Sequence, residues 1–298
     1  MHTRTHLLRL GTLCAALLLG GAAGARPLGE PWALVPWGDA GLSPGGGERQ
    51  AVGPTALAAS DGAVWIADAA NERLLRVGQG GVEASIPLGF APEDVRVAGT
   101  PFALAADLET VAFARPSGVQ RVRAGLTEVR GLAVAPDGAA WVVDAQGHGA
   151  PILAPAADGS RAEPLGARHG VGRVDGPRQG RALLWEWNDP ADLKRAPVVE
   201  LPIRTDLPLG LVRPLRAHAD GTVTVLLELL ASTSPVAVTA EVRRMDAAGR
   251  VLDAVSFQVS GVAPANRYVD VEADGTLWIM QAREDGLALW RLAPGGAR

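Results

Sequence analysis

The sequence predicts an all-β fold, a ring of six four-stranded sheets that forms a six-bladed β-propeller. An Asp-Gly pair followed by apolar residues and a tryptophan occurs at Asp61-Gly62 and recurs at Asp137-Gly138 and Asp274-Gly275. Corresponding glycines are separated by 37 to 42 residues, and by 54 for the last pair: Gly62, Gly99, Gly138, Gly180, Gly221 and Gly275. This period is typical of a propeller blade.

The first 25 residues read as a secretory signal peptide. Arg4 and Arg9 precede an apolar run from Leu10 to Leu19, which is followed by the small residues Ala23-Gly24-Ala25. This order is typical of an export signal, and the run is about half the length that a membrane span needs. We therefore expect cleavage after Ala25, a single domain over residues 26–298, and a secreted or periplasmic bacterial protein with no membrane span.

The first repeat unit sets the pattern for the others. We expect its strands over residues 54–59, 63–68, 72–77 and 82–86, from the inside of the ring outward. The Asp-Gly pair supplies the positive φ of a tight hairpin between the first two strands. The equivalent tryptophans Trp65, Trp141 and Trp278 are then expected to pack between blades, because one sheet cannot bury both of its faces alone.

The last unit offers only three strands, over residues 268–272, 276–281 and 287–292. The extended segment Trp32 to Trp37 is therefore predicted to pair as the outer strand of this blade. Such a pairing would close the ring and remove an open sheet edge.

Two stretches could also be helical. Residues 102–114 and 223–231 are rich in alanine, leucine and glutamate. We assign both to strands, because a long helix would break the repeat and local propensity is a weak guide. Prolines between His169 and Leu209 predict long loops there, so an irregular or five-bladed ring remains an alternative.

One unit resembles the NHL repeat, a family of β-propellers. The pattern is carried by Trp37-Gly38, Pro54, Asp61-Gly62, Asp68, Asn71 and Arg73. The unit beginning at Pro136 keeps Asp137, Gly138 and Asp144 but has Gln146-Gly147-His148 in place of Asn-x-Arg. This resemblance implies a fold rather than an activity, since such propellers include binding modules, scaffolds and lyases.

The chain is also similar, more distantly, to the six-bladed calcium-dependent gluconolactonases, in Val52-Gly53-Pro54 and Arg130-Gly131-Leu132-Ala133. That family has a metal-binding Glu at the place of Val52 and an Asn at the place of Arg130. Because calcium needs several oxygen ligands, this alignment implies that the metal site is not kept. We expect no cofactor and no metal.

Polar residues are predicted to gather on one face of the ring, where the central channel opens and ligands usually sit. In propellers this face carries the loops after the second strand of each blade and the loops that enter the next blade. Asp68 and Asp144 are read chiefly as turn residues, His148 and His169 as solvated loop residues, and His218 is placed on the opposite face. The candidate ligand-binding residues are Asp68, Asn71, Asp144, His148, His169, Asn188 and Arg267.

The leading hypothesis is an exported, non-catalytic, monomeric propeller that binds a small molecule, peptide or protein at this channel-mouth face. Without the signal the chain holds 26 basic and 32 acidic residues, so its net charge of about −6 disfavours nucleic acid as a partner. The alternative is a metal-dependent lyase or hydrolase that uses Asp68, Asp144, His148 and His169. The enzyme would need these four side chains to converge on one metal or water position.

Overall fold

The computed structural model describes residues 28–38, 42–43, 53–115, 117–124, 129–134, 140–144, 149–152, 181–184, 199–218, 220–233, 236–246, 248–259 and 266–294. Within these ranges the chain forms β-strands, one short 3-10 helix, Ala69–Asn71, and no α-helix. None of the described residues belongs to a helix that is long and apolar enough to cross a membrane.

The described strands form six antiparallel sheets in chain order, four of them with four strands. The first and second sheets contain β2 (Pro54–Ser60), β3 (Ala63–Asp68), β4 (Arg73–Gly78) and β5 (Gly81–Pro87), then β6 (Pro92–Ala98), β7 (Thr100–Ala105), β8 (Thr110–Arg115) and β9 (Gly118–Arg123). The third and fourth sheets contain β10 (Val129–Val134), β11 (Ala140–Asp144) and β12 (Gly149–Pro151), then β13 (Arg181–Leu184) and β14 (Val199–Pro202).

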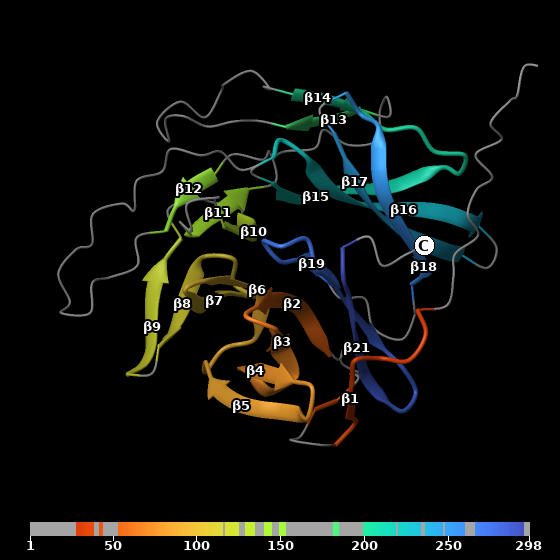
Figure 1. Ribbon diagram of the computed structural model, residues 1–298. Helices are drawn as coiled ribbons and strands as arrows, with labels where there is room; N and C mark the ends of the chain where they lie inside the picture. Colours follow the sequence, from red (N-terminus) through yellow and green to blue (C-terminus); the bar gives the residue numbers. More distant parts are fainter. Residues whose placement is uncertain are drawn as a thin grey trace, which may run out of the picture.

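The fifth and sixth sheets complete the order. The fifth contains β15 (Leu209–Ala217), β16 (Val223–Thr233), β17 (Val236–Met245) and β18 (Val251–Gln258). The sixth contains β19 (Val269–Val271), β20 (Leu277–Ala282), β21 (Gly286–Leu292) and the first strand of the chain, β1 (Ala33–Pro36). Figure 1 shows the sheets following one another around a common centre, with the first strand of each four-stranded unit nearest to it.

The hairpin glycines behave as the repeat predicts. Gly62, Gly99, Gly221 and Gly275 each lie between the first and second strands of a sheet and have φ values between 65° and 87°. A residue with a side chain rarely adopts this left-handed backbone conformation, whereas glycine does so without steric cost. The repeated glycine therefore reflects a repeated turn.

Strand positions also match the sequence expectations. The four strands of the first unit begin and end within one residue of their predicted bounds. The two stretches that could have been helical form strands, because residues 102–114 fall in β7, β8 and the turn between them, and residues 223–231 fall in β16. The repeat was thus a better guide than local helix propensity.

The first strand closes the sheet of the last strands, as predicted. β1 pairs antiparallel with β21, with Ala33 opposite Leu289 and Pro36 opposite Gly286. β1 is consequently the outer strand of the sixth sheet, whose order is β1-β21-β20-β19. The two ends of the described chain are held together by one strand pair.

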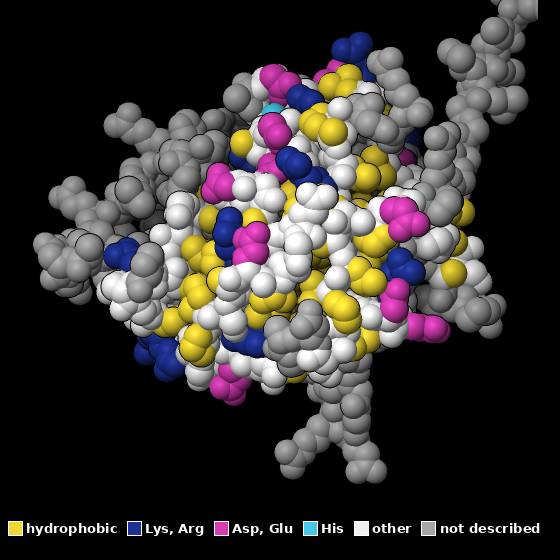
Figure 2. All heavy atoms as spheres, turned by 60° about the horizontal axis from the view of Figure 1, so that its bottom comes forward, with side chains coloured by type: hydrophobic (Ala, Val, Ile, Leu, Met, Phe, Trp, Pro, Cys, Tyr) yellow, Lys and Arg dark blue, Asp and Glu magenta, His cyan; other side chains and the backbone are white. Residues whose placement is uncertain are grey.

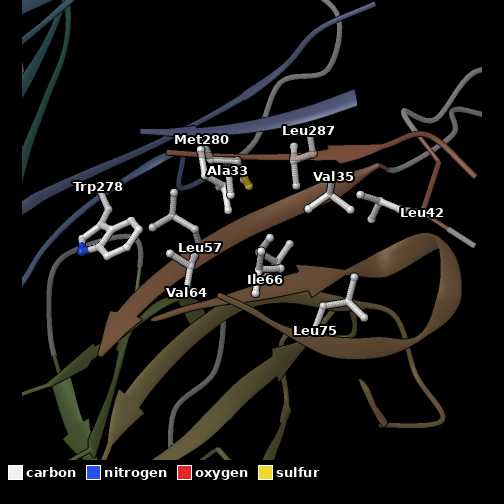
Figure 3. Close-up of a cluster of buried hydrophobic side chains, with 12 residues drawn as sticks. Ala33, Val35, Leu42, Leu57, Val64, Ile66, Leu75, Trp278, Met280 and Leu287 are labelled. Atoms are coloured by element: carbon white, nitrogen blue, oxygen red, sulfur yellow. The ribbon is translucent and has the colours of Figure 1, made fainter. Parts of the chain in front are cut away.

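A hydrophobic cluster fills the space between the sixth and first sheets (Figure 3). Val35 of β1 and Leu287 of β21 pack with Ile66 and Leu75 of the first sheet, and all four are at most 1% exposed. Trp278 is fully buried in the same cluster. Trp65 packs against a second cluster, which joins the first and second sheets. These two tryptophans therefore pack between sheets, as the sequence predicts.

Candidate functional site

Asp68 and Asn71 belong to one hydrogen-bonded group at the end of β3. Asp68 pairs with Pro54, which starts the inner strand β2. The end of the second strand and the start of the inner strand therefore lie at the same edge of the sheet. The buried Asp68 carboxylate accepts hydrogen bonds from Asn71 Nδ2 at 2.9 Å and from Arg73 Nε at 2.7 Å. The three residues of the Asp-x-x-Asn-x-Arg pattern thus fix the connection between β3 and β4.

The other predicted site residues divide between this edge and undescribed parts of the chain. Asp144 ends β11 opposite Val129, so its backbone lies at the same edge as Asp68. His148, His169 and Asn188 lie outside the described residues. The convergence of Asp68 and Asp144 with the two histidines therefore stays a condition of the alternative metal-dependent enzyme.

Arg267 lies at the centre of the ring, where it forms a bidentate ion pair with Asp94 of β6. Arg267 Nε and Nη2 each donate to one oxygen of the Asp94 carboxylate at 2.8 Å. The two residues are only 8% and 4% exposed. The backbone N–H of Leu132, in β10, also donates to Asp94 at 2.8 Å. The predicted ligand residue Arg267 thus ties together the sixth, second and third sheets.

A second ion pair lies next to the first. Arg96 of β6 contacts Asp270 of β19 with 2.5 Å between Nη1 and Oδ1. The other carboxylate oxygen of Asp270 accepts the backbone N–H of Ala59, in β2, at 3.0 Å. Asp94, Arg96, Arg267 and Asp270 form the central cluster, in which two cations balance two anions.

Within the central cluster, the electrostatics of the Asp94–Arg267 pair favour its ionised form. Burial alone would raise the pKa of Asp94, but the charge and hydrogen bonds of Arg267, together with the charge of Arg96 and the N–H of Leu132, lower it below the usual value. The pKa of Arg267 is raised, because the attraction of Asp94 outweighs the effect of burial. Each partner keeps the other charged, as expected for a desolvated ion pair with complementary hydrogen bonds.

A less enclosed group lies at the edge where the inner strands begin. We define the entrance cluster as Glu93, Arg213, Glu228, Asn266 and Tyr268. Asn266 Nδ2 donates to Glu93, and Arg213 Nη1 donates to the carbonyl oxygen of Asn266. Tyr268 donates its hydroxyl to Glu228 at 2.8 Å. The cluster connects the second, fifth and sixth sheets.

Arg213 is the cation of the entrance cluster, which also contains the carboxylates of Glu93 and Glu228. Among the described residues it donates to one backbone carbonyl and forms no ion pair. Burial and the nearby charge of Arg267 lower its pKa, and the charges of Asp94 and Glu228 oppose this shift only in part. Burial and the Glu228 carboxylate raise the pKa of Tyr268, so this phenol stays protonated at neutral pH. The arrangement therefore offers guanidinium N–H groups to an anionic group.

The charged residues near the centre differ in what they can do chemically. The carboxylates of the central cluster are both engaged in ion pairs with guanidinium groups. Among the residues that the structure describes, no group of three or more His, Cys, Asp and Glu side chains is placed to hold a metal ion.

His218 lies beyond the end of β15, at the opposite edge from Asp68, as predicted, and its Nε2 is 2.8 Å from Thr224 Oγ1.

The face of the molecule that Figure 2 shows does not single out one partner by its charge. Figure 2 shows acidic and basic side chains scattered among apolar ones over the visible face.

Sequence reasoning missed Asp94, Arg96, Arg213 and Asp270. None of them lies in the Asp-Gly turns that carry the repeat. Each falls near or within a first strand of its unit, which the repeat places next to the axis. A charged residue in a predicted inner strand could therefore have indicated a buried polar contact at the axis.

Comparisons with known proteins add a distant likeness in shape. The sequence matches no protein-family model and no curated protein. A structure of a catalytically inactive virginiamycin B lyase from Staphylococcus aureus with quinupristin is 13% identical, with a TM-score of 0.42 over 83% of this chain and 86% of that one. Glutaminyl cyclase from Myxococcus xanthus is 14% identical, with a TM-score of 0.40 over 80% of this chain and 88% of that one.

A nidogen/laminin complex provides another similar chain. It is 17% identical, with a TM-score of 0.39 over 68% of this chain and 80% of that one. Because these likenesses are so distant, the fold described above rests on the strand pairing of the chain itself.

Proposed function

We propose that this chain is an exported, six-bladed β-propeller of the NHL-like type that binds a ligand through an anionic group at the entrance cluster. The six described sheets support the blade count, with the third and fourth sheets as blades of which three and two strands are described. The export signal predicted over residues 1–25 supports the location outside the cytoplasm.

The observation that carries the proposal is the position of Arg213. Its guanidinium group lies where inner strands of three sheets meet, and its described hydrogen bond uses one of five N–H donors. A guanidinium group that is partly removed from water and keeps unused N–H donors gains from binding a carboxylate, because charge-assisted hydrogen bonds are stronger in such a setting. A carboxylate of a small molecule or an acidic peptide has the required chemistry.

Binding is favoured over catalysis because the carboxylates of the central cluster are already held in ion pairs. Asp94 and Asp270 are paired with arginines inside the ring, where they hold neighbouring inner strands together. Asp68 is likewise occupied by Asn71 and Arg73. A ring stabilised in this way can present a rigid surface to a ligand with little loss of conformational entropy.

The proposal is tested by thermal unfolding of the chain that begins at Arg26. The protein is screened with small di- and tricarboxylates and with acidic peptides. A ligand at about a hundred times its dissociation constant adds roughly 2.7 kcal/mol to the free energy of unfolding, which raises the melting temperature visibly. The rise should be lost in Arg213→Gln and kept in Arg250→Gln, which changes an arginine paired with Asp246 far from the entrance.

Two results would overturn the binding proposal. One is a ligand response that Arg213→Gln leaves unchanged. The other is a large rise with Zn²⁺ or Ca²⁺ after chelator treatment that His148→Ala or His169→Ala abolishes, since that result would favour the metal-dependent lyase or hydrolase.

A further inference from the structure

The entrance cluster holds two opposite charges on one face of the fifth sheet. Arg213 of β15 lies opposite Leu226 of β16, and Leu211, two residues earlier, lies opposite Glu228. Because residues opposite one another in paired strands point to the same face, Arg213 and Glu228 are diagonal neighbours on it. Diagonal neighbours are about 7–8 Å apart, which is within the reach of long side chains. The sheet therefore places a cation and an anion where both can contact one small ligand.

Arg213 and Glu228 bind to other partners rather than to each other. Both use the segment that leads into β19, which lies beside β15 (Figure 1). Arg213 donates to the carbonyl oxygen of Asn266. Glu228 accepts the hydroxyl of Tyr268 at 2.8 Å. Within the described part of the chain no ion pair joins the two side chains, so the segment before β19 holds the two charges apart.

Each of the two side chains keeps unused hydrogen-bonding capacity. Glu228 accepts the Tyr268 hydroxyl with Oε1, and among the described residues no donor contacts its Oε2. Arg213 uses one of its five guanidinium N–H groups. Both residues are half-buried, so a ligand can reach them from solvent at the edge where the inner strands begin.

Glu228 is also held in a fixed orientation. Tyr268 is only 7% exposed, and its hydroxyl fixes one oxygen of the carboxylate. Burial and the charge of Glu228 raise the pKa of Tyr268, so the phenol remains a hydrogen-bond donor at neutral pH. The carboxylate therefore loses little conformational freedom when its other oxygen binds a ligand.

The charges of the entrance cluster favour a ligand that carries both signs. The cluster contains one guanidinium group, that of Arg213, and two carboxylates, those of Glu93 and Glu228. A ligand with negative groups alone would add to this negative excess, and like charges repel one another. A ligand with an ammonium group beside its carboxylate offers a partner to each sign instead.

We propose that the entrance cluster binds a free amino acid, with its carboxylate on Arg213 and its ammonium group on the open oxygen of Glu228. The two side chains come from adjacent strands of one sheet, so the two charges of the ligand must be close together, as they are on the α-carbon of an amino acid. This assignment rests on the proposed function, because it adds a second charged group to the anionic ligand.

The test is isothermal titration calorimetry of the chain that begins at Arg26 with two matched pairs of probes. Propanoate is compared with L-alanine and glutarate with L-glutamate, and the members of each pair differ only by the α-ammonium group. The amino compound should bind about tenfold more tightly than the acid, because the acid leaves the contact with Glu228 unmade. Ethylamine, which lacks the carboxylate, should also bind about tenfold more weakly than L-alanine.

Three variants locate the ammonium group. Glu228→Gln removes the charge and keeps an acceptor for the Tyr268 hydroxyl, so it should abolish the preference for the amino compounds without weakening the acids. Tyr268→Phe keeps the carboxylate, so the preference should persist. Glu109→Gln removes a carboxylate that pairs with Arg123 of the outer strand β9, and it should bind all probes like the unaltered protein. The two probe pairs remain decisive on the unaltered protein if Glu228→Gln does not fold.

Three results would overturn this assignment, and they bear differently on the anion site. Equal binding of acids and amino compounds, with both weakened by Arg213→Gln, would remove the ammonium contact and leave the anion site in place. A preference for amino compounds that survives in Glu228→Gln would place the ammonium group elsewhere. No binding of any probe up to about 10 mM, where a weak small-ligand site should be occupied, would count against both.

Discussion

Arg267 and Asp94 are 173 residues apart in the sequence and form a bidentate ion pair with two 2.8 Å hydrogen bonds at the centre of the ring. Arg267 precedes the first strand of the sixth sheet, and Asp94 lies in the first strand of the second. The pair can form only when the sheets have assembled around the axis, so its geometry reports on the assembled ring.

Removing one member of this pair should strongly destabilise the protein. Arg267→Met leaves the buried Asp94 carboxylate without its main partner, and we expect the free energy of unfolding to fall by about 3–5 kcal/mol. Urea denaturation followed by tryptophan fluorescence measures the change. The double variant Arg267→Met with Asp94→Asn should recover part of the loss, because no unpaired charge remains. A loss below about 1 kcal/mol for Arg267→Met would show that water reaches Asp94.

β1, the strand that completes the sixth sheet, contains two neighbouring apolar residues that differ in burial. Val35 is 1% exposed in the cluster between the sixth and first sheets, whereas Leu34 is 38% exposed. Val35→Ala should lower the free energy of unfolding by about 2 kcal/mol, through lost burial and the cavity left behind. Leu34→Ala should change it by about 0.5 kcal/mol or less. Equal effects in the same urea experiment would contradict the role of β1 in closing the ring.

Asp220 should titrate at unusually low pH. Hydrogen bonds from the hydroxyl and backbone N–H of Thr222 lower its pKa to about 2, with a smaller effect of Arg244. Because the folded pKa lies below the unfolded value near 3.9, this carboxylate favours the folded state above about pH 4, and the contribution is lost between about pH 4 and 2. Carbon-13 NMR of the carboxyl group measures the pKa.

Two variants separate the causes of this shift. Thr222→Ala removes the hydroxyl and should raise the pKa of Asp220 more than Arg244→Gln does. A larger rise in Arg244→Gln would mean that the ion pair, rather than the turn, sets the pKa.

The sequence predicted the parts of the fold that depend on local pattern. The strands on either side of Asp61-Gly62 could be placed because a tight hairpin requires positive φ at its centre, and the same requirement recurs at Gly275. The burial of Trp278 followed from the need of each sheet to cover its faces. The pairing of β1 with β21 followed from counting three strands in the last unit.

The central cluster could not be predicted in the same way. Asp94, Arg96 and Asp270 have no neighbours in the sequence that reveal their partners, because each partner lies in another sheet. Arg267 was identified as a ligand residue from its position at the edge of the sixth unit, but the structure pairs its side chain with Asp94. Local patterns specify turns, whereas ion pairs between distant strands depend on the whole ring.

The pairing of Ala33 with Leu289 also has a consequence for the timing of synthesis. β1 is made among the first segments of the chain, and its partner β21 follows roughly 250 residues later, at about 5–20 residues per second. For about ten to fifty seconds the apolar side of β1 has no β21 to pair with. The sixth sheet therefore cannot be completed until the last strand of the chain has been made.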